Sequence, residues 1–145
     1  MQASDYGIPA DFRHWQGDPA EDHIGPFFYR RVDDRSIETA LRLQSQHCNS
    51  HRSVHGGVLM AFIDYTLCVA AVANGEDEGV VTVSCNTEFV DGAQADTLVY
   101  GHGEVIRRTG SLVFTRGQIK AEDGRVLLNA SAVVKRIRRR ERRAL

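Results

Sequence analysis

The chain has 145 residues, a length typical of one domain with its own hydrophobic core, and it is 42% hydrophobic and 26% charged. This composition excludes the disordered, collagen-like and disulfide-scaffold classes. The net charge of -1 hides an asymmetry, because residues 135–143 hold seven basic residues and one acidic residue. The rest of the chain has 11 basic and 18 acidic residues, so the chain is an acidic body with a basic tail.

The cysteine usage indicates reduced thiols and a cytoplasmic protein. Cys48, Cys68 and Cys85 are widely spaced and form no CxxC pair, so we expect neither a disulfide framework nor a metal site. The N-terminus lacks the basic and apolar segments of a signal peptide. The most apolar stretch, residues 58–73, is shorter than the ~20 residues of a membrane span and contains Asp64. We therefore expect a buried helix there and no membrane span.

The first half of the chain predicts an arm, a strand hairpin and a helix. Residues 1–26 contain all three prolines, and we expect an N-terminal arm with one short helix lying on the body. Residues 27–32 and 37–44 predict a hairpin, because apolar and polar residues alternate in the second run. Residues 46–53 predict a loop. The run that follows is apolar on every face of a helix and ends near Asn74-Gly75, so we expect the protein to enclose it.

The second half of the chain predicts strands only. Four strand-like runs, residues 80–90, 98–106, 111–121 and 126–134, are separated by turn regions. Consecutive antiparallel strands cannot form a parallel doubly wound sheet. We predict an α+β fold in which a curved antiparallel β-sheet wraps around one long central α-helix. The predicted domain covers residues 27–136, and residues 137–145 form the basic tail.

Asp64 is the residue of the apolar helix that needs an explanation. A lone buried carboxylate costs several kcal/mol unless it is paired or hydrogen-bonded. In one interpretation Asp64 faces a polar seam or pairs with an arginine. In the other, the helix projects a general base or nucleophile into a dry cleft.

His55-Gly56-Gly57 stands where this helix begins. A helix N-terminus leaves its first N–H groups unpaired, and glycine lets a ligand approach the backbone closely, so these amides could stabilise an oxyanion. A Gly-Gly pair is also common in a simple tight turn. Eight residues separate Gly56 from Asp64, which is about 12 Å along one helix. A site that uses both groups on one carbonyl therefore needs two antiparallel helices and predicts a homodimer.

This combination of residues resembles a known family, the hotdog-fold acyl-CoA thioesterases of the phenylacetate-pathway (PaaI-like) type. The residues that carry the resemblance, with their spacing, are Asn49, His55, Gly56, Gly57, Asp64, Thr82 and Asn86. The resemblance covers roughly residues 27–136. It implies a long helix wrapped by an antiparallel sheet, and dimers that usually pair into tetramers.

The resemblance also implies roles for the catalytic residues. Asp64 matches the catalytic carboxylate, and the amide of Gly56 matches the group that polarises the thioester carbonyl. Asn49 matches a polar residue that helps to place the carboxylate or water. Thr82 stands where relatives often have serine or threonine, supplied by the same subunit as Asp64.

Further residues match the substrate-binding part of the family pattern. His55 and Gly57 match the start of the helix, where the histidine mainly shapes the backbone. Arg107, Arg108 and Thr109 resemble the turn that often meets the pantetheine or nucleotide part of coenzyme A. No separate cofactor is implied, because coenzyme A is part of the substrate, a small or aromatic acyl-CoA.

Alternatives stay open at this point. The same fold could be a non-catalytic acyl-CoA-binding or regulatory module. A hotdog-fold hydratase would need its own arrangement of histidine and carboxylate, which the sequence does not show. The basic tail could be a solvated end, attract the phosphates of coenzyme A, or bind nucleic acid or a membrane surface. The acidic body and the lack of interleaved aromatic residues count against nucleic acid.

Overall fold

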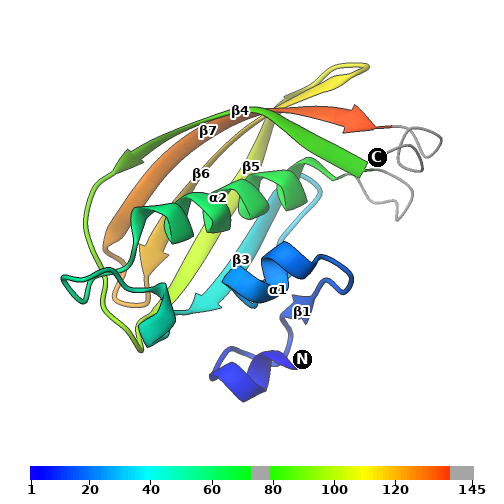
Figure 1. Ribbon diagram of the computed structural model, residues 1–145. Coiled ribbons are helices and arrows are strands. Elements are labelled where there is room, and N and C mark those ends of the chain that lie inside the picture. The colour runs from blue at the N-terminus through cyan, green and yellow to red at the C-terminus, as the bar shows by residue number, and fades with distance from the viewer. Residues whose placement is uncertain (73–78, 138–145) are drawn as a thin grey trace.

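The computed structural model describes residues 1–72 and 79–137 (Figure 1). In chain order the elements are η1 (Ala3–Tyr6), β1 (Arg13–His14), α1 (Pro19–Ile24), β2 (Phe28–Arg31), β3 (Ser36–Arg42), η2 (Ser45–His47), α2 (Gly56–Ala71), β4 (Gly79–Phe89), β5 (Leu98–Arg108), β6 (Leu112–Ala121) and β7 (Val126–Ile137). The described strands form one sheet in the order β1-β2-β3-β5-β6-β7-β4, and every neighbouring pair is antiparallel. Figure 1 shows this sheet curving around α2, which confirms the predicted α+β architecture.

The predicted hairpins of the sheet are confirmed. β2 pairs with β3, and the turn between them is closed by Asp33, whose carboxylate accepts hydrogen bonds from the amide of Arg35 and the hydroxyl of Ser36. β6 and β7 pair across the turn that contains Gly124, whose φ of +90° favours glycine. β7 continues to Ile137, beyond the predicted end of the last strand at residue 134.

The position of β4 differs from the sequence-based expectation of consecutive hairpin strands. β4 does not pair with β5, which follows it along the chain; it pairs with β7 at one edge of the sheet. The segment between residues 90 and 97, expected to be a turn region, is therefore a connection from the sheet edge to its centre. This order leaves β4 beside α2, with a free edge in the described part of the chain.

The sheet accepts α2 at very short range because glycines line the contact. A Cβ atom on Gly101 would lie 2.3 Å from the hydroxyl of Thr39 and 2.5 Å from that of Thr66. These two buried hydroxyls hydrogen-bond each other at 2.7 Å, and the hydroxyl of Thr66 also donates to the carbonyl of Phe62. Gly103 and Gly117 likewise face α2, so this side of the helix is fixed by contact with the sheet backbone.

α2 ends at Ala71, where the guanidinium of Arg108 donates hydrogen bonds to the carbonyl oxygens of Ala70 and Ala71. A cation at this end suits the negative end of the helix dipole. The helix end expected at Asn74-Gly75 lies outside the described residues, as do residues 138–145 of the basic tail. No helix in the described ranges is long and apolar enough to cross a membrane.

The arm packs on the body and extends the sheet. Its short strand β1 pairs with β2, and its side chains Ala3, Ile8 and Phe12 are buried in an apolar cluster with Phe28. The one short helix expected in the arm is α1, which begins at Pro19 after the N-cap residue Asp18. Figure 1 shows α1 beside α2, on the side away from the centre of the sheet.

Candidate active site

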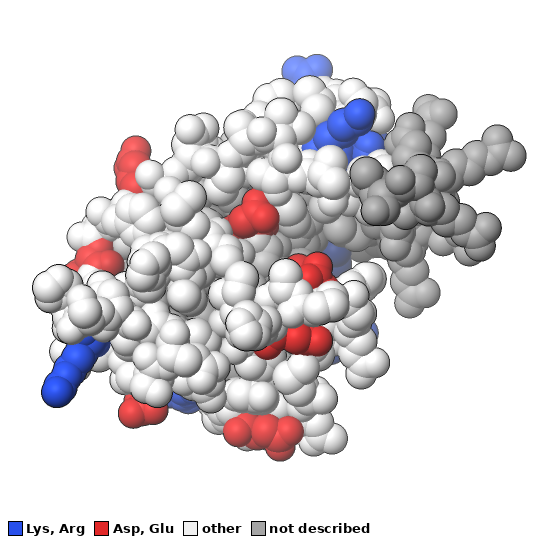
Figure 2. All heavy atoms as spheres, viewed as in Figure 1, with Lys and Arg blue, Asp and Glu red and all other residues white. Residues whose placement is uncertain are grey.

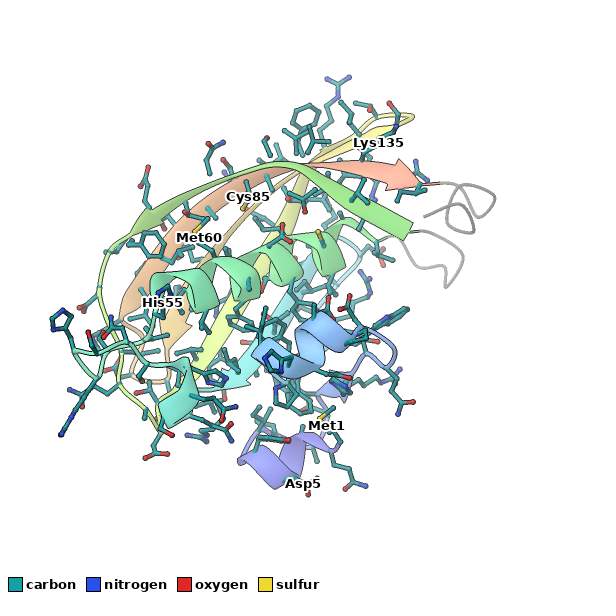
Figure 3. All side chains as sticks on the ribbon, in the orientation of Figure 1. Met1, Asp5, His55, Met60, Cys85 and Lys135 are labelled. Atoms are coloured by element: carbon teal, nitrogen blue, oxygen red, sulfur yellow. The ribbon has the colours of Figure 1, made fainter. Side chains whose placement is uncertain are left out.

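Within one chain, α2 is not covered on every side. Gly57 and Met60 are exposed, and Ala61, Asp64 and Cys68 are half-buried. These positions repeat every three or four residues and therefore form one stripe along the helix, which we call the open stripe. Figure 3 shows Met60 and Cys85 on this side of the helix, between α2 and β4. The expectation that the protein encloses the whole helix is wrong for a single chain, and Asp64 lies on the uncovered part.

A hydroxyl on β4 holds the carboxylate of Asp64. Oγ1 of Thr82 donates a hydrogen bond of 2.6 Å to Oδ1 of Asp64. The other oxygen of Asp64 has no polar contact from the described residues, and no arginine pairs with it there. The structure thus brings two predicted site residues together within one chain, and it leaves one carboxylate oxygen available to a ligand.

Two thiols lie next to this pair. Sγ of Cys68 is 3.3 Å from Oγ1 of Thr82, and the thiol is the donor because the single hydroxyl hydrogen of Thr82 points to Asp64. Burial and the charge of Asp64 raise the pKa of Cys68 to about 12 and also raise the pKa of Cys85. Both thiols therefore stay protonated near neutral pH, which argues against a cysteine nucleophile.

At the start of α2, the backbone amides of Gly56 and Gly57 differ in their hydrogen bonding. Nδ1 of His55, the N-cap residue, accepts a hydrogen bond of 2.9 Å from the amide of Gly57. The amide of Gly56 has no hydrogen-bond partner among the described residues. The ring of Phe89 lies over Gly56, where an added Cβ would be 3.2 Å from the ring. The free N–H at the helix start therefore belongs to Gly56, and Gly57 is already bonded to its own cap.

Asn49 organises the loop that precedes α2. Its side-chain oxygen accepts hydrogen bonds from the amides of His51, at 2.9 Å, and Ser53, at 3.3 Å. The backbone N–H of Asn49 donates to the carbonyl of Ser53. These contacts shape the entry to the helix rather than reaching Asp64 of the same chain.

The predicted coenzyme A contacts at Arg107, Arg108 and Thr109 lie at the other end of α2. Arg108 caps the helix as described above, and Thr109 closes the turn before β6 by bonding the backbone of Leu112. Arg107 is exposed beside an irregular step in the β5–β6 pairing. Within one chain these three residues lie far from Gly56. Of the two arginines, Arg107 is the exposed one.

Gly56 and Asp64 cannot meet on one small group within a single chain. They lie on the same straight helix, about 12 Å apart along its axis. The predicted catalytic residues thus form two separate groups on one chain, which we call half-sites. One half-site holds the free amide of Gly56, and the other holds Asp64 with Thr82.

Comparison with known proteins identifies the family. Residues 51–128 match the family model described as the thioesterase superfamily. The chain belongs to this superfamily. A curated relative from Pseudomonas aeruginosa, named as an inferred esterase, is 28% identical over 128 residues, which are 87% of this chain and 95% of that protein.

Solved structures confirm the hotdog fold. The PaaI protein from the phenylacetic acid degradation operon of Escherichia coli has a TM-score of 0.75 at 17% identity, covering 84% of this chain and 86% of that chain. A thioesterase from Haemophilus influenzae has a TM-score of 0.75 at 15% identity, covering 85% of each chain. A thioesterase-like protein from Streptococcus pneumoniae, solved with coenzyme A, has a TM-score of 0.67 at 14% identity, covering 77% of this chain and 86% of that chain.

Two further side chains belong to elements that pack on α2, and the sequence did not assign either of them a role in catalysis. Phe89 covers Gly56, and burial, with the charges of Asp18, Asp22 and Asp64, raises the pKa of Glu21 in the arm to about 7. The Asp18-Pro19 pair signals the helix that carries Glu21, but no local pattern shows where that helix packs. Among the described residues, no group of three or more histidine, cysteine, aspartate or glutamate side chains could hold a metal ion.

Proposed function

We propose that the protein is an acyl-CoA thioesterase that hydrolyses a small or aromatic acyl-CoA to the free acid and coenzyme A. Membership of the thioesterase superfamily supports thioester hydrolysis, and a structurally similar protein was solved with coenzyme A. The observation that carries the proposal is Asp64, a carboxylate on the open stripe of the central helix that is oriented by Thr82 and has one free oxygen. A carboxylate in this position can act as a general base or as a nucleophile toward the carbonyl carbon of a thioester.

In the proposed reaction, Asp64 acts in one of two ways. As a general base it takes a proton from a water molecule, whose oxygen forms the new bond to the thioester carbon. As a nucleophile it forms that bond itself, and water then cleaves the resulting anhydride. In both routes the carbon–sulfur bond breaks, its electrons go to sulfur, and the sulfur receives a proton.

The amide of Gly56 from a facing subunit would stabilise the negative charge that develops on the carbonyl oxygen. In the part of the chain that the structure describes, this N–H has no partner, and it lies at the positive end of the helix dipole, where it can donate to an oxyanion. His55 would hold the backbone beside it through its bond to Gly57, and Asn49 would keep the preceding loop in place. Arg107 is exposed and would attract the phosphates of coenzyme A, and the seven basic residues of 135–143 carry charge of the same sign.

A dimer as the active unit is supported by the surface beside the open stripe. β4 has a free edge in the described part of the chain, and Val81 and Val83 on it are exposed. Met60 of the stripe and Phe89 beside Gly56 are also exposed. An apolar edge strand favours pairing with a second chain, which would bring the two half-sites together. Pairing of such dimers into a homotetramer is a further part of the proposal.

The experiment is a free-thiol assay on a panel of short, long and aromatic acyl-CoA esters with wild-type protein and the Asp64→Asn variant. We expect hydrolysis of small or aromatic members, and a loss of turnover of about 10² or more in Asp64→Asn, the scale of a lost catalytic base. Asp96→Asn, which removes an exposed carboxylate distant from the stripe in sequence, is the matched control. Binding of acyl-CoA without hydrolysis would favour the non-catalytic module instead, and wild-type turnover in Asp64→Asn would contradict the assignment.

A further inference from the structure

The hydroxyl of Thr82 lies between two side chains of α2. Its Oγ1 atom is 2.6 Å from Oδ1 of Asp64 and 3.3 Å from Sγ of Cys68. Asp64 and Cys68 are four residues apart, so they lie on the same face of α2 and are separated by about one turn. A single oxygen atom of β4 therefore bridges two consecutive turns of the helix on the open stripe.

The chemistry of the three groups fixes the direction of both hydrogen bonds. An ionised carboxylate only accepts, so Thr82 donates its one hydroxyl hydrogen to Asp64. The lone pairs of the same oxygen are left to accept, and the thiol of Cys68 donates to one of them. Burial, with the charge of Asp64, raises the pKa of Cys68 to about 12, so the thiol keeps its hydrogen at neutral pH. The hydrogen bonds thus run in one direction, from Cys68 to Thr82 to Asp64.

The orientation of Asp64 depends on how firmly Thr82 is held. Within residues 1–72 and 79–137, the hydroxyl of Thr82 is the group that orients this carboxylate. Figure 2 shows an acidic group over α2 that is surrounded in this view by uncharged atoms. A threonine side chain can occupy three staggered rotamers, and Thr82 is exposed, so packing alone does not select one of them. The second contact, with Cys68, favours the rotamer that places the hydroxyl between the two helix side chains.

We propose that Cys68 is a positioning residue of the active site, whose thiol holds the hydroxyl of Thr82 on Oδ1 of Asp64 and so keeps the other carboxylate oxygen directed at the reacting groups. The proposal rests on the proposed thioesterase function. Donation by the thiol also polarises the hydroxyl, which strengthens the bond from Thr82 to Asp64. Cys68 does not touch the substrate in this scheme and keeps its covalent state, so no further reactant is needed.

The first test measures kcat and KM of full-length Cys68→Ala and Cys68→Ser with the acyl-CoA ester that wild type hydrolyses fastest. Cys68→Ala removes the donor, and we expect kcat to fall about two- to fivefold, the scale of one weak hydrogen bond, with KM little changed. Cys68→Ser keeps a donor at the same place and should retain most of the wild-type kcat. Cys48→Ala is the matched control, because Cys48 is also a half-buried thiol but donates to the carbonyl of Gln44. Wild-type kcat in Cys68→Ala, or an equal loss in Cys68→Ser, would overturn the proposal.

A double-mutant cycle separates positioning from simple packing. Because Cys68 acts through Thr82, Cys68→Ala should cause no further loss of kcat in a protein that already carries Thr82→Val. A thiol that only filled space would lower kcat by the same factor in both backgrounds. Losses that multiply in the double variant would therefore contradict the positioning role.

A spectroscopic readout does not depend on activity. The S–H stretching band in the infrared moves to lower frequency when a thiol donates a hydrogen bond, and subtracting the spectrum of the matching Cys68→Ala protein isolates the band of Cys68. We expect this band to move to higher frequency in Thr82→Val and to stay in place in Thr82→Ser, which keeps the hydroxyl. An unchanged band in Thr82→Val would overturn the hydrogen-bond chain. If the band shifts but wild type hydrolyses no acyl-CoA, the thioesterase function and the positioning role fail together, whereas the bond from Cys68 to Thr82 stands.

Discussion

The two sides of α2 differ in whether their polar groups are already satisfied. On the sheet side, Thr66 bonds both Thr39 and the carbonyl of Phe62, and Gly101 leaves no space for a larger residue. On the open stripe, one oxygen of Asp64 has no partner among residues 1–72 and 79–137, and the stripe begins beside the amide of Gly56, which also has none there. One side of α2 is therefore packed with its polar groups paired, and on the other side the described residues leave polar groups without partners. Buried polar groups in proteins are usually paired, and in the proposed function the groups without partners lie on the side that receives a ligand or a second chain.

The largest effect is expected from a larger side chain on the side of α2 that contacts the sheet. We expect Gly101→Ala to destabilise the protein by about 2–4 kcal/mol, because the added methyl group meets both threonine hydroxyls at less than van der Waals distance. Chemical denaturation monitored by circular dichroism measures this loss. Gly110→Ala is the control, since a Cβ there meets nothing within 4 Å and Gly110 has no positive φ. Equal stability of the Gly101 variant and wild type would show that the contact is not tight.

Replacing threonine by valine on each side of α2 should separate an effect on stability from an effect on activity. Thr66→Val removes a buried hydroxyl that bonds the helix backbone, and we expect a loss of stability of about 1–2 kcal/mol with little change in turnover. Thr82→Val removes the hydrogen bond to Asp64, and we expect turnover to fall about tenfold with stability nearly unchanged. Paired denaturation and turnover measurements on both variants provide the check. If both variants lose stability and activity in the same proportion, the two sides are not distinct.

The sequence predicted local elements well and their distant neighbours poorly. Alternation in residues 37–44 identified β3, and the all-round apolar run identified α2, because both patterns depend on residues close in the chain. The edge position of β4 was missed, since periodicity does not tell which strand will be the partner. Thr82 reaches Asp64 because β4 pairs with β7 and therefore lies beside α2. The packing of α1 against α2 joins segments that are far apart in the chain, and no short-range pattern records it.

A smaller effect is expected from the loop that leads into α2. Burial lowers the pKa of His47, against the opposing effect of backbone groups at Ile24 and Gly25, so the folded protein favours the neutral imidazole. The unfolded chain then binds more protons as the pH falls through about 6.5, and the contribution of His47 to stability, present above that pH, is lost on acidification. Thermal denaturation at pH 8 and pH 5.5 should show a smaller drop in Tm for His47→Gln than for wild type. His51→Gln, an exposed neighbour in the same loop, should behave as wild type.

The most direct test of the account mixes two inactive variants to ask whether the half-sites come from different chains. Asp64→Asn lacks the carboxylate, and Gly56→Pro lacks the amide hydrogen. Proline is tolerated at the first position of a helix, and the extended backbone of His55 suits a residue before proline. The added Cβ would lie 3.2 Å from the ring of Phe89, which is exposed and can shift, so this variant should fold. After subunit exchange, shown by mass-tagged chains, half of the dimers are mixed and each has one intact site. We expect about a quarter of wild-type thioesterase activity to return, and no recovery after demonstrated exchange would contradict a site built from two chains.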